Sequence, residues 1–240
     1  VAVKKLFFSQ SLGELFAFLH GARTQKELES FGCFWWKDWV TTEKCAKREL
    51  PEGALGHGSY GAAWHDFPTA DGGSFNQIQH LVEQIKELPH LRTHFISPWI
   101  PQYIGRGKGK IQKGVVAPCH GWIHVLANIA TNELTIHHFQ RSADVPVGLV
   151  CNLIEYAALT LMLSQVTGYK AKNLVYTISD AHIYLGQMND VDKMLATQPQ
   201  IFPTVQLDPK VKNLLDFRQE HFTVTDYQSQ LPRRKIWTPI

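Results

Sequence analysis

The chain has 240 residues, of which 44% are hydrophobic and 19% charged, and its formal net charge is only +3. This composition can bury a full apolar core, and so small a charge makes nucleic-acid binding an unfavoured function. The chain has no stretch of eighteen uninterrupted apolar residues, so the sequence predicts no transmembrane helix. The first residues also lack the long apolar stretch of a secretory signal. The four cysteines form no Cys-x-x-Cys pair, so we expect no zinc site, no disulfide framework and a reduced, cytoplasmic location.

Helical and strand patterns follow one another without an internal repeat or a linker, so we expect a single domain over residues 1–240. In chain order, they predict helices at 11–20 and 25–31, a glycine-rich loop at 52–61, an amphipathic helix at 74–88 and a strand at 94–99. A basic glycine loop at 105–113, a hairpin of 122–129 and 133–140, a buried helix at 152–166, a strand at 173–178 and a helix at 188–197 follow. Because residue 1 is not Met, we expect further residues upstream of it.

A cysteine and an arginine lie at the two ends of the predicted hairpin. Cys119 stands in the segment Ala-Pro-Cys-His, and Arg141 follows the second strand in Gln-Arg-Ser-Ala-Asp. A thiol is a useful nucleophile only as a thiolate, which nearby positive charge stabilises. Because the hairpin returns the chain, we expect Arg141 beside Cys119, where it lowers the pKa of the thiol and can also bind an anion. The alternative is a half-buried cysteine near an unrelated surface arginine.

Five segments together resemble the thymidylate synthase family. They are 60–64 (Tyr-Gly-Ala-Ala-Trp), 118–120 (Pro-Cys-His), 140–144 (Gln-Arg-Ser-Ala-Asp), Gly148 with Asn152, and 180–184 (Asp-Ala-His-Ile-Tyr). They come in the family's order and cover nearly the whole chain. The resemblance implies an α+β domain with a large, mostly antiparallel twisted sheet, and a homodimer formed back to back through that sheet. It also implies methylation of dUMP by methylene-tetrahydrofolate, without a metal or a membrane.

The resemblance implies roles for the residues on the nucleotide side. Cys119 would add to carbon-6 of uracil, which is covalent catalysis. Arg141 and Ser142 would bind the phosphate, and Gln140 would flank the nucleotide. Asn152 would read uracil, because an amide offers both a donor and an acceptor. A related hydroxymethylase group that acts on dCMP carries Asp at this position, and the alternative role for Asn152 is a helix N-cap.

Three further residues are assigned to the nucleotide by the same resemblance. His182 and Tyr184 lie two residues apart, so on an extended segment they face the same side, where they would bond the sugar 3′-hydroxyl. Arg92 would reach across the dimer to the partner's phosphate. The alternative for residues 180–184 is an ordinary amphipathic strand.

The resemblance assigns four residues to the folate side and Tyr60 to the proton on carbon-5. Glu14 would organise water and relay protons, since a carboxylate on a mostly apolar helix needs a compensating role. Tyr60 would assist removal of the carbon-5 proton through water. Trp36 would form an apolar wall for the pterin, Asp144 an acceptor and Gly148 a contact. Trp36 taken alone is more typical of plain core, and Glu14 of a helix residue on the solvent edge.

Several residues depart from the family pattern, mostly on the folate and phosphate sides. Thr93 replaces a second phosphate arginine, and the family's N-terminal arginine loop would lie upstream of the chain. Cys151 stands where a Phe usually packs the pterin, and the closing tail at 237–240 matches only in part. The first hypothesis is thymidylate synthase. A hydroxymethylase of dUMP or dCMP, in which water captures the exocyclic methylene, is the second. The third is a weakly catalytic RNA-binding relative, supported only by the basic loop at 105–113.

Overall fold

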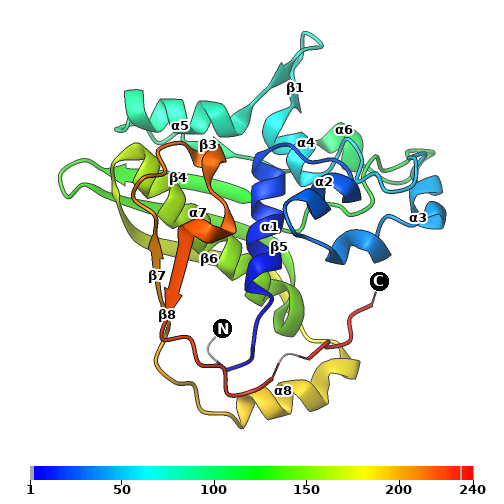
Figure 1. The fold of residues 1–240 in the computed structure, drawn as a ribbon. Helices are drawn as coiled ribbons and strands as arrows, with labels where there is room; N and C mark the ends of the chain where they lie inside the picture. The colour runs from blue at the N-terminus through cyan, green and yellow to red at the C-terminus, as the bar shows by residue number, and fades with distance from the viewer. Residues whose placement is uncertain (1–2, 233, 240) are drawn as a thin grey trace.

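The computed structural model describes residues 3–232 and 234–239, and the chain forms an α+β fold (Figure 1). The sequence expectations that concern residues 1, 2 and 240 lie outside the described residues. The helices are α1 (Phe8–Leu19), α2 (Gln25–Ser30), α3 (Thr42–Ala46), α4 (Tyr60–His65), α5 (Gln77–Glu87), α6 (Pro101–Ile104), α7 (Val150–Thr167) and α8 (Met188–Leu195). The strands are β1 (Phe67–Pro68), β2 (Ser74–Phe75), β3 (Phe95–Ile96), β4 (Trp122–Asn128), β5 (Glu133–Asp144), β6 (Lys170–His182), β7 (Thr204–Leu207) and β8 (Phe222–Thr225).

The main sheet has the strand order β3-β4-β5-β6. The predicted hairpin is confirmed: β4 and β5 are antiparallel, with a register from Trp122↔Phe139 to Asn128↔Glu133. The longest pairing, β5 with β6, is parallel, because the chain crosses over through α7 before it returns to the sheet. The sheet is therefore mixed, with two antiparallel pairings and one long parallel one, and the expected mostly antiparallel arrangement is correct only in part.

Two predicted elements are shorter in the structure than the residue pattern suggested. Helix α5 begins at Gln77, because the Asn76 side chain accepts a hydrogen bond from Gln79 N at 2.9 Å and caps the helix. Strand β3 has only two residues. Beyond it, Ser97 N donates to the Gln77 side chain at 2.9 Å, and Pro98 has no N–H to offer a neighbouring strand.

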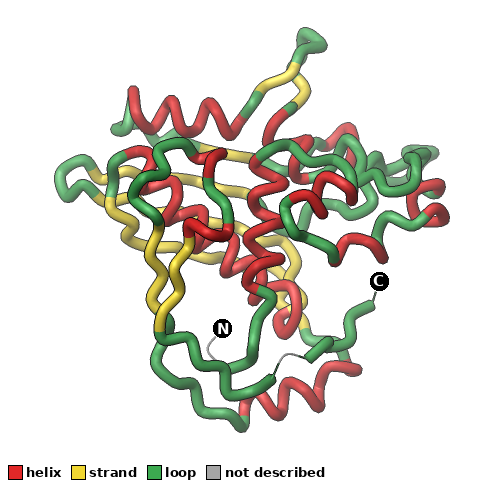
Figure 2. Tube along the Cα trace, in the orientation of Figure 1, coloured by secondary structure: helices red, strands yellow, loops and turns green. Residues whose placement is uncertain are grey.

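Helix α7 is the centre of the hydrophobic core. It contacts α1 as well as strands β5 and β6, and Figure 2 shows the long strands running behind the central helices. The stretch Val145–Thr167 is long and apolar enough to cross a membrane, but 56% of its 18-residue window with a mean hydropathy of 1.6 is buried inside the protein. Its composition is explained by this packing, as the sequence pattern of a buried helix predicts.

Helix α4 approaches the turn after α1 so closely that only glycine fits at the contact. A Cβ atom on Gly61 would lie 2.8 Å from Ala22 N and closer still to the Ala22 carbonyl oxygen. This contact sets the position of Tyr60, which begins α4.

We therefore predict that Gly61→Ala lowers the free energy of unfolding by about 1–3 kcal/mol, the usual cost of overpacking. The measurement is the urea midpoint followed by circular dichroism. Gly148→Ala is the matched control, because a Cβ atom there meets nothing within 4 Å. An equal loss of stability in both variants would contradict the steric explanation.

Candidate active site

Arg141 and Cys119 are in direct contact. Arg141 Nη2 lies 3.3 Å from Cys119 Sγ, and Arg141 N donates to the Cys119 carbonyl at 2.8 Å. The guanidinium also donates to the carbonyls of Ala117, at 2.9 Å, and Pro118, at 2.8 Å. The proximity expected from the hairpin is therefore observed, and Arg141 holds the loop that carries the thiol as well as the thiol itself.

The pKa of the Cys119 thiol differs from the sequence expectation. Burial raises the pKa above its ordinary value, and the charge and hydrogen bond of Arg141 lower it by less than burial raises it. The expectation of a lowered pKa is therefore wrong for this structure, because the same packing that brings the arginine close also removes water from the sulfur. The guanidinium limits this upward shift of the thiol pKa.

A column of buried rings stands behind the thiol. The Tyr60 hydroxyl accepts a hydrogen bond from Cys119 N at 2.7 Å, and its ring stacks on His120 with centroids 4.4 Å apart. Burial raises the pKa of Tyr60 well above its usual value, so the hydroxyl keeps its proton at neutral pH. His120 Nδ1 lies 2.5 Å from the Tyr156 hydroxyl, and Tyr156 stacks on His138 at 3.7 Å. Burial lowers the pKa of His120 to about 3 and that of His138 to about 2, so both imidazoles are neutral.

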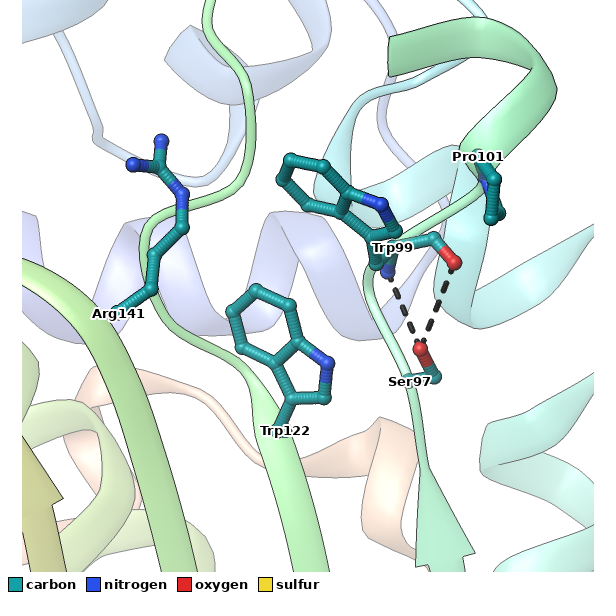
Figure 3. Close-up of a pocket in the computed structure, with 5 residues that line it drawn as sticks. All are labelled: Ser97, Trp99, Pro101, Trp122 and Arg141. Carbon is teal, nitrogen blue, oxygen red and sulfur yellow. Dashed lines mark hydrogen bonds between the residues drawn. The ribbon is translucent and has the colours of Figure 1, made fainter. Parts of the chain in front are cut away.

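A pocket of about 420 Å³ opens beside Arg141 (Figure 3). Its walls include Trp99 and Trp122, whose rings are stacked with centroids 6.0 Å apart, together with Ser97 and Pro101. The Arg141 guanidinium carbon lies 5.8 Å from the centre of the Trp99 ring, a cation–π distance. The sequence reasoning did not find these two tryptophans. The only signal for them in the sequence is their position: Trp99 follows the strand before the Cys119 loop, and Trp122 begins the strand after it.

A second group of contacts joins Gln140 and Asn152. Gln140 Nε2 donates to Asn152 Oδ1 at 3.1 Å and to the Ser142 carbonyl at 2.9 Å, while the Tyr176 hydroxyl donates to Gln140 Oε1. Asn152 Nδ2 donates to Glu155 Oε2 at 3.3 Å. Asn152 is not the N-cap of α7, whose capping position is Leu149. The N-cap alternative is therefore wrong, and the Asn152 amide lies inside a polar network.

The residues expected at the sugar gather at the carboxyl ends of two parallel strands. Ser142 of β5 pairs with Asp180 of β6, and Asp144 pairs with His182. The rings of His182 and Tyr184 lie 4.9 Å apart, so the two side chains share one side, as their spacing predicts. Asp180 Oδ2 accepts from Ser142 Oγ at 3.3 Å and lies 3.1 Å from His182 Nδ1. A carboxylate therefore occupies the centre of this cluster.

Glu14 and Trp36 are also brought together. Glu14 Oε1 accepts hydrogen bonds from the indole nitrogens of Trp35, at 2.9 Å, and Trp36. These donors explain how a carboxylate on an apolar helix is tolerated at 5% exposure, and the solvent-edge alternative for Glu14 is wrong. Trp36 is 8% exposed and packs against Phe18, so little of its ring is open to a ligand, as the plain-core alternative predicts.

The last residues on the folate side lie where the C-terminal segment returns. Asp144 accepts from Gln187 Nε2, at 3.0 and 2.9 Å, and from Thr238 Oγ1 at 2.8 Å. Gln187 Nε2 also donates to the Trp237 carbonyl at 2.9 Å. Beside Gly148 there is open space. Because each carboxylate oxygen has two lone pairs, Asp144 can accept a further hydrogen bond, so these residues fit a flat heterocycle that carries a donor.

Arg92 and the basic loop at 105–113, which the sequence also singled out, share no hydrogen bond or ion pair with the Cys119–Arg141 pair among the described residues. The Arg92 side chain is exposed in the turn before β3. In the basic loop, Arg106 Nε donates to Gln112 at 2.5 Å, and Lys113 forms an ion pair with Glu49. Among residues 3–232 and 234–239, no group of three or more His, Cys, Asp or Glu side chains is placed to hold a metal ion.

A thiol in contact with a guanidinium that also lines an open pocket is an arrangement suited to nucleophilic catalysis. The family model described as thymidylate synthase matches residues 1–237, so the chain belongs to the thymidylate synthase family. This is a family of folate-dependent enzymes of the methyltransferase type that serve dTMP biosynthesis.

We predict that the rate of Cys119 alkylation by iodoacetamide rises with pH and reaches its midpoint at a higher pH than for an ordinary thiol, because burial raises the pKa of Cys119. Arg141→Met removes the opposing charge, so the midpoint should move to still higher pH, while Arg141→Lys should move it less. Peptide mapping separates Cys119 from Cys151, whose pKa burial raises to about 11. A midpoint that moves to lower pH in Arg141→Met would contradict the electrostatic role.

Proposed function

We propose that the protein is a thymidylate synthase that converts dUMP to dTMP with methylene-tetrahydrofolate as donor of carbon and hydride. The observation that carries this proposal is the 3.3 Å contact between Arg141 Nη2 and Cys119 Sγ, next to the pocket lined by Trp99 and Trp122. The buried amide of Asn152 supports uracil as the base, because its donor and acceptor match the ring N–H and carbonyl together.

In the proposed reaction, the Cys119 thiolate adds to carbon-6 of uracil. The carbon–sulfur bond forms while the π electrons of the carbon-5–carbon-6 bond move toward carbon-5 and the carbon-4 oxygen. Carbon-5 then bonds to the one-carbon unit and loses its proton to water that the Tyr60 hydroxyl helps to hold. The carbon–nitrogen bonds that held this unit to the folate break, the electron pairs leave with the folate nitrogens, and an exocyclic methylene stays on the base. After hydride reduces the exocyclic methylene to a methyl group, the carbon–sulfur bond breaks and Cys119 leaves as the thiolate. Arg141 stabilises that thiolate both before the first step of the reaction and after the last one.

The reduced folate, when bound, supplies the one-carbon unit and the hydride and is released as dihydrofolate. Asp144 and Gly148 would hold its pterin, since an acceptor stands there beside open space. The Glu14 carboxylate, held by the two indole nitrogens, would orient water on the same side. His182 and Tyr184 would bind the sugar hydroxyl of the nucleotide.

A hydroxymethylase remains the second candidate, and one observation favours it. The small side chain of Cys151 is half-buried beside the open space at Gly148, so the pterin side lacks a bulky apolar wall. A loosely covered site admits water, which would capture the exocyclic methylene before hydride transfer. In that case the product base carries a hydroxymethyl group.

We also propose that the chain acts as a homodimer through the exposed face of its main sheet. One row of paired residues, Phe95, His124, His137 and Val175, crosses all four strands. Phe95 and Val175 are among the exposed large hydrophobic side chains, and Phe139 lies exposed on the same face of β5. A flat apolar sheet face of this kind favours pairing with a second copy. Arg92, in the turn before β3, would then reach the partner's phosphate.

The reaction is tested by incubation of the protein with dUMP and methylene-tetrahydrofolate. We expect a rise in dihydrofolate absorbance and a methylated base by mass spectrometry. Cys119→Ala should abolish turnover because no carbon–sulfur bond can form, yet it should still bind dUMP by calorimetry. Cys45→Ala, at a buried cysteine away from the site, is the control and should keep turnover. Full activity of Cys119→Ala would exclude the covalent mechanism, and a hydroxymethyl product would select the second candidate.

The shared site is tested by mixing inactive variants. Arg92→Ala should weaken dUMP binding, so the assay uses a dUMP concentration at which this variant alone shows no turnover. Mixing it with Cys119→Ala should then restore about a quarter of the wild-type activity, since half of the dimers are mixed and each has one intact site. The control is Arg141→Ala mixed with Cys119→Ala, which should stay inactive because both residues serve one site from the same chain. Equal results in the two mixtures, or a monomer by sedimentation that turns over normally, would reject the shared site.

A further inference from the structure

Glu155 is a buried carboxyl group that the proposed mechanism leaves without a role. It is 1% exposed and is the only acidic residue of α7, where it follows Asn152 by three residues and so lies on the same helix face. Its Oε2 accepts from Asn152 Nδ2 at 3.3 Å, and its Oε1 has no hydrogen-bond partner among the described residues. A buried carboxyl with an unsatisfied oxygen costs stability, so its presence beside the base-reading amide calls for a function.

The orientation of the Asn152 amide follows from a chain of hydrogen bonds. The Ser142 backbone carbonyl can only accept, so the Gln140 atom 2.9 Å from it must be Nε2. The same nitrogen lies 3.1 Å from Asn152, so the Asn152 atom there must be the acceptor Oδ1. Asn152 Nδ2 then faces Glu155, whose Oε2 accepts from it. The Tyr176 hydroxyl, which donates to Gln140 Oε1, fixes the other end of this chain.

The surroundings of Glu155 favour its neutral acid form. Burial raises its pKa well above the ordinary value, and the neighbouring Glu14 of α1 raises it further. The other titratable groups that act on it are Cys151 and Tyr156 of α7, Cys33 after α2 and Tyr176 of β6. None of these groups is a cation, so nothing in this set favours the carboxylate. Its carbonyl oxygen remains available to Asn152, whether or not the acid ionises.

We infer that Glu155 is a positioning residue that, with Gln140, locks the Asn152 amide in one orientation and so sets the choice between uracil and cytosine. This inference rests on the proposed pyrimidine-nucleotide function. Uracil presents a ring N–H and a carbonyl, whereas cytosine presents a ring acceptor and an amino group. A side-chain amide that can flip presents its donor and acceptor in either order and matches both bases. An amide held in one orientation matches the hydrogen-bonding pattern of only one base. After its two internal bonds, Asn152 keeps one N–H and one lone pair for the base.

The test compares Glu155→Met, which removes the acceptor at similar volume, with Glu155→Gln, which keeps an acceptor oxygen. Calorimetry gives the dissociation constants for dUMP and dCMP. The dissociation constant for dCMP divided by that for dUMP should fall about five- to tenfold in Glu155→Met, the effect of one net hydrogen bond. The same ratio should keep its wild-type value in Glu155→Gln. Ser164→Ala, at a buried polar residue farther along α7, is the matched control and should leave the ratio unchanged.

A second measurement needs no nucleotide. The Asn152 side-chain amide protons, identified in NMR spectra by their loss in Asn152→Asp, should exchange slowly with solvent in the wild type and Glu155→Gln, and faster in Glu155→Met. An unchanged ratio and unchanged exchange in Glu155→Met would overturn the positioning role. Equal losses in Glu155→Met and Glu155→Gln would overturn it as well. If the wild type binds neither nucleotide, the proposed function fails, and the exchange rates still decide whether Glu155 holds Asn152.

Discussion

The contact of Arg141 with the Cys119 loop is the interaction on which the site depends. One arginine donates to the carbonyls of Ala117 and Pro118, to the Cys119 sulfur and, through its backbone, to the Cys119 carbonyl. Arg141 therefore fixes the position of the Cys119 thiol and places a positive charge beside it. Because β5 continues into Ser142 and Asp144, the strand that carries this arginine also positions the groups expected at the sugar and the pterin.

Burial gives the titratable groups of this site their protonation states. Desolvation raises the pKa values of Cys119, Tyr60 and Glu155 and therefore favours their neutral forms. At the sulfur, the charge and hydrogen bond of Arg141 oppose this effect, and hydrogen bonds from neighbouring groups oppose it at Tyr60 and Glu155. The positive charge of Arg141 thus lies beside the Cys119 sulfur, while the Asn152 amide is bonded to Gln140 and to the Glu155 carboxyl.

The sequence predicted what depends on local pattern. Periodicity and turn residues were enough to predict the hairpin, the buried helix and the approach of Arg141 to Cys119. The order of the motifs along the chain was enough to predict the family. The raised pKa of Cys119 was not predictable, because it depends on how much water the surrounding chain excludes. Glu155 was missed for a related reason: its spacing from Asn152 was visible, but its burial arises only when α7 packs on α1 and the sheet.

The ring column behind the thiol also affects how the protein tolerates acid. His120 and His138 are held neutral, with pKa values of about 3 and about 2, whereas in an unfolded chain each would titrate near 6.5. Between those values the unfolded chain binds more protons than the folded one, so stability declines as the pH falls below about 6.5. Acidic pH would therefore destabilise the layer of rings that packs behind Cys119.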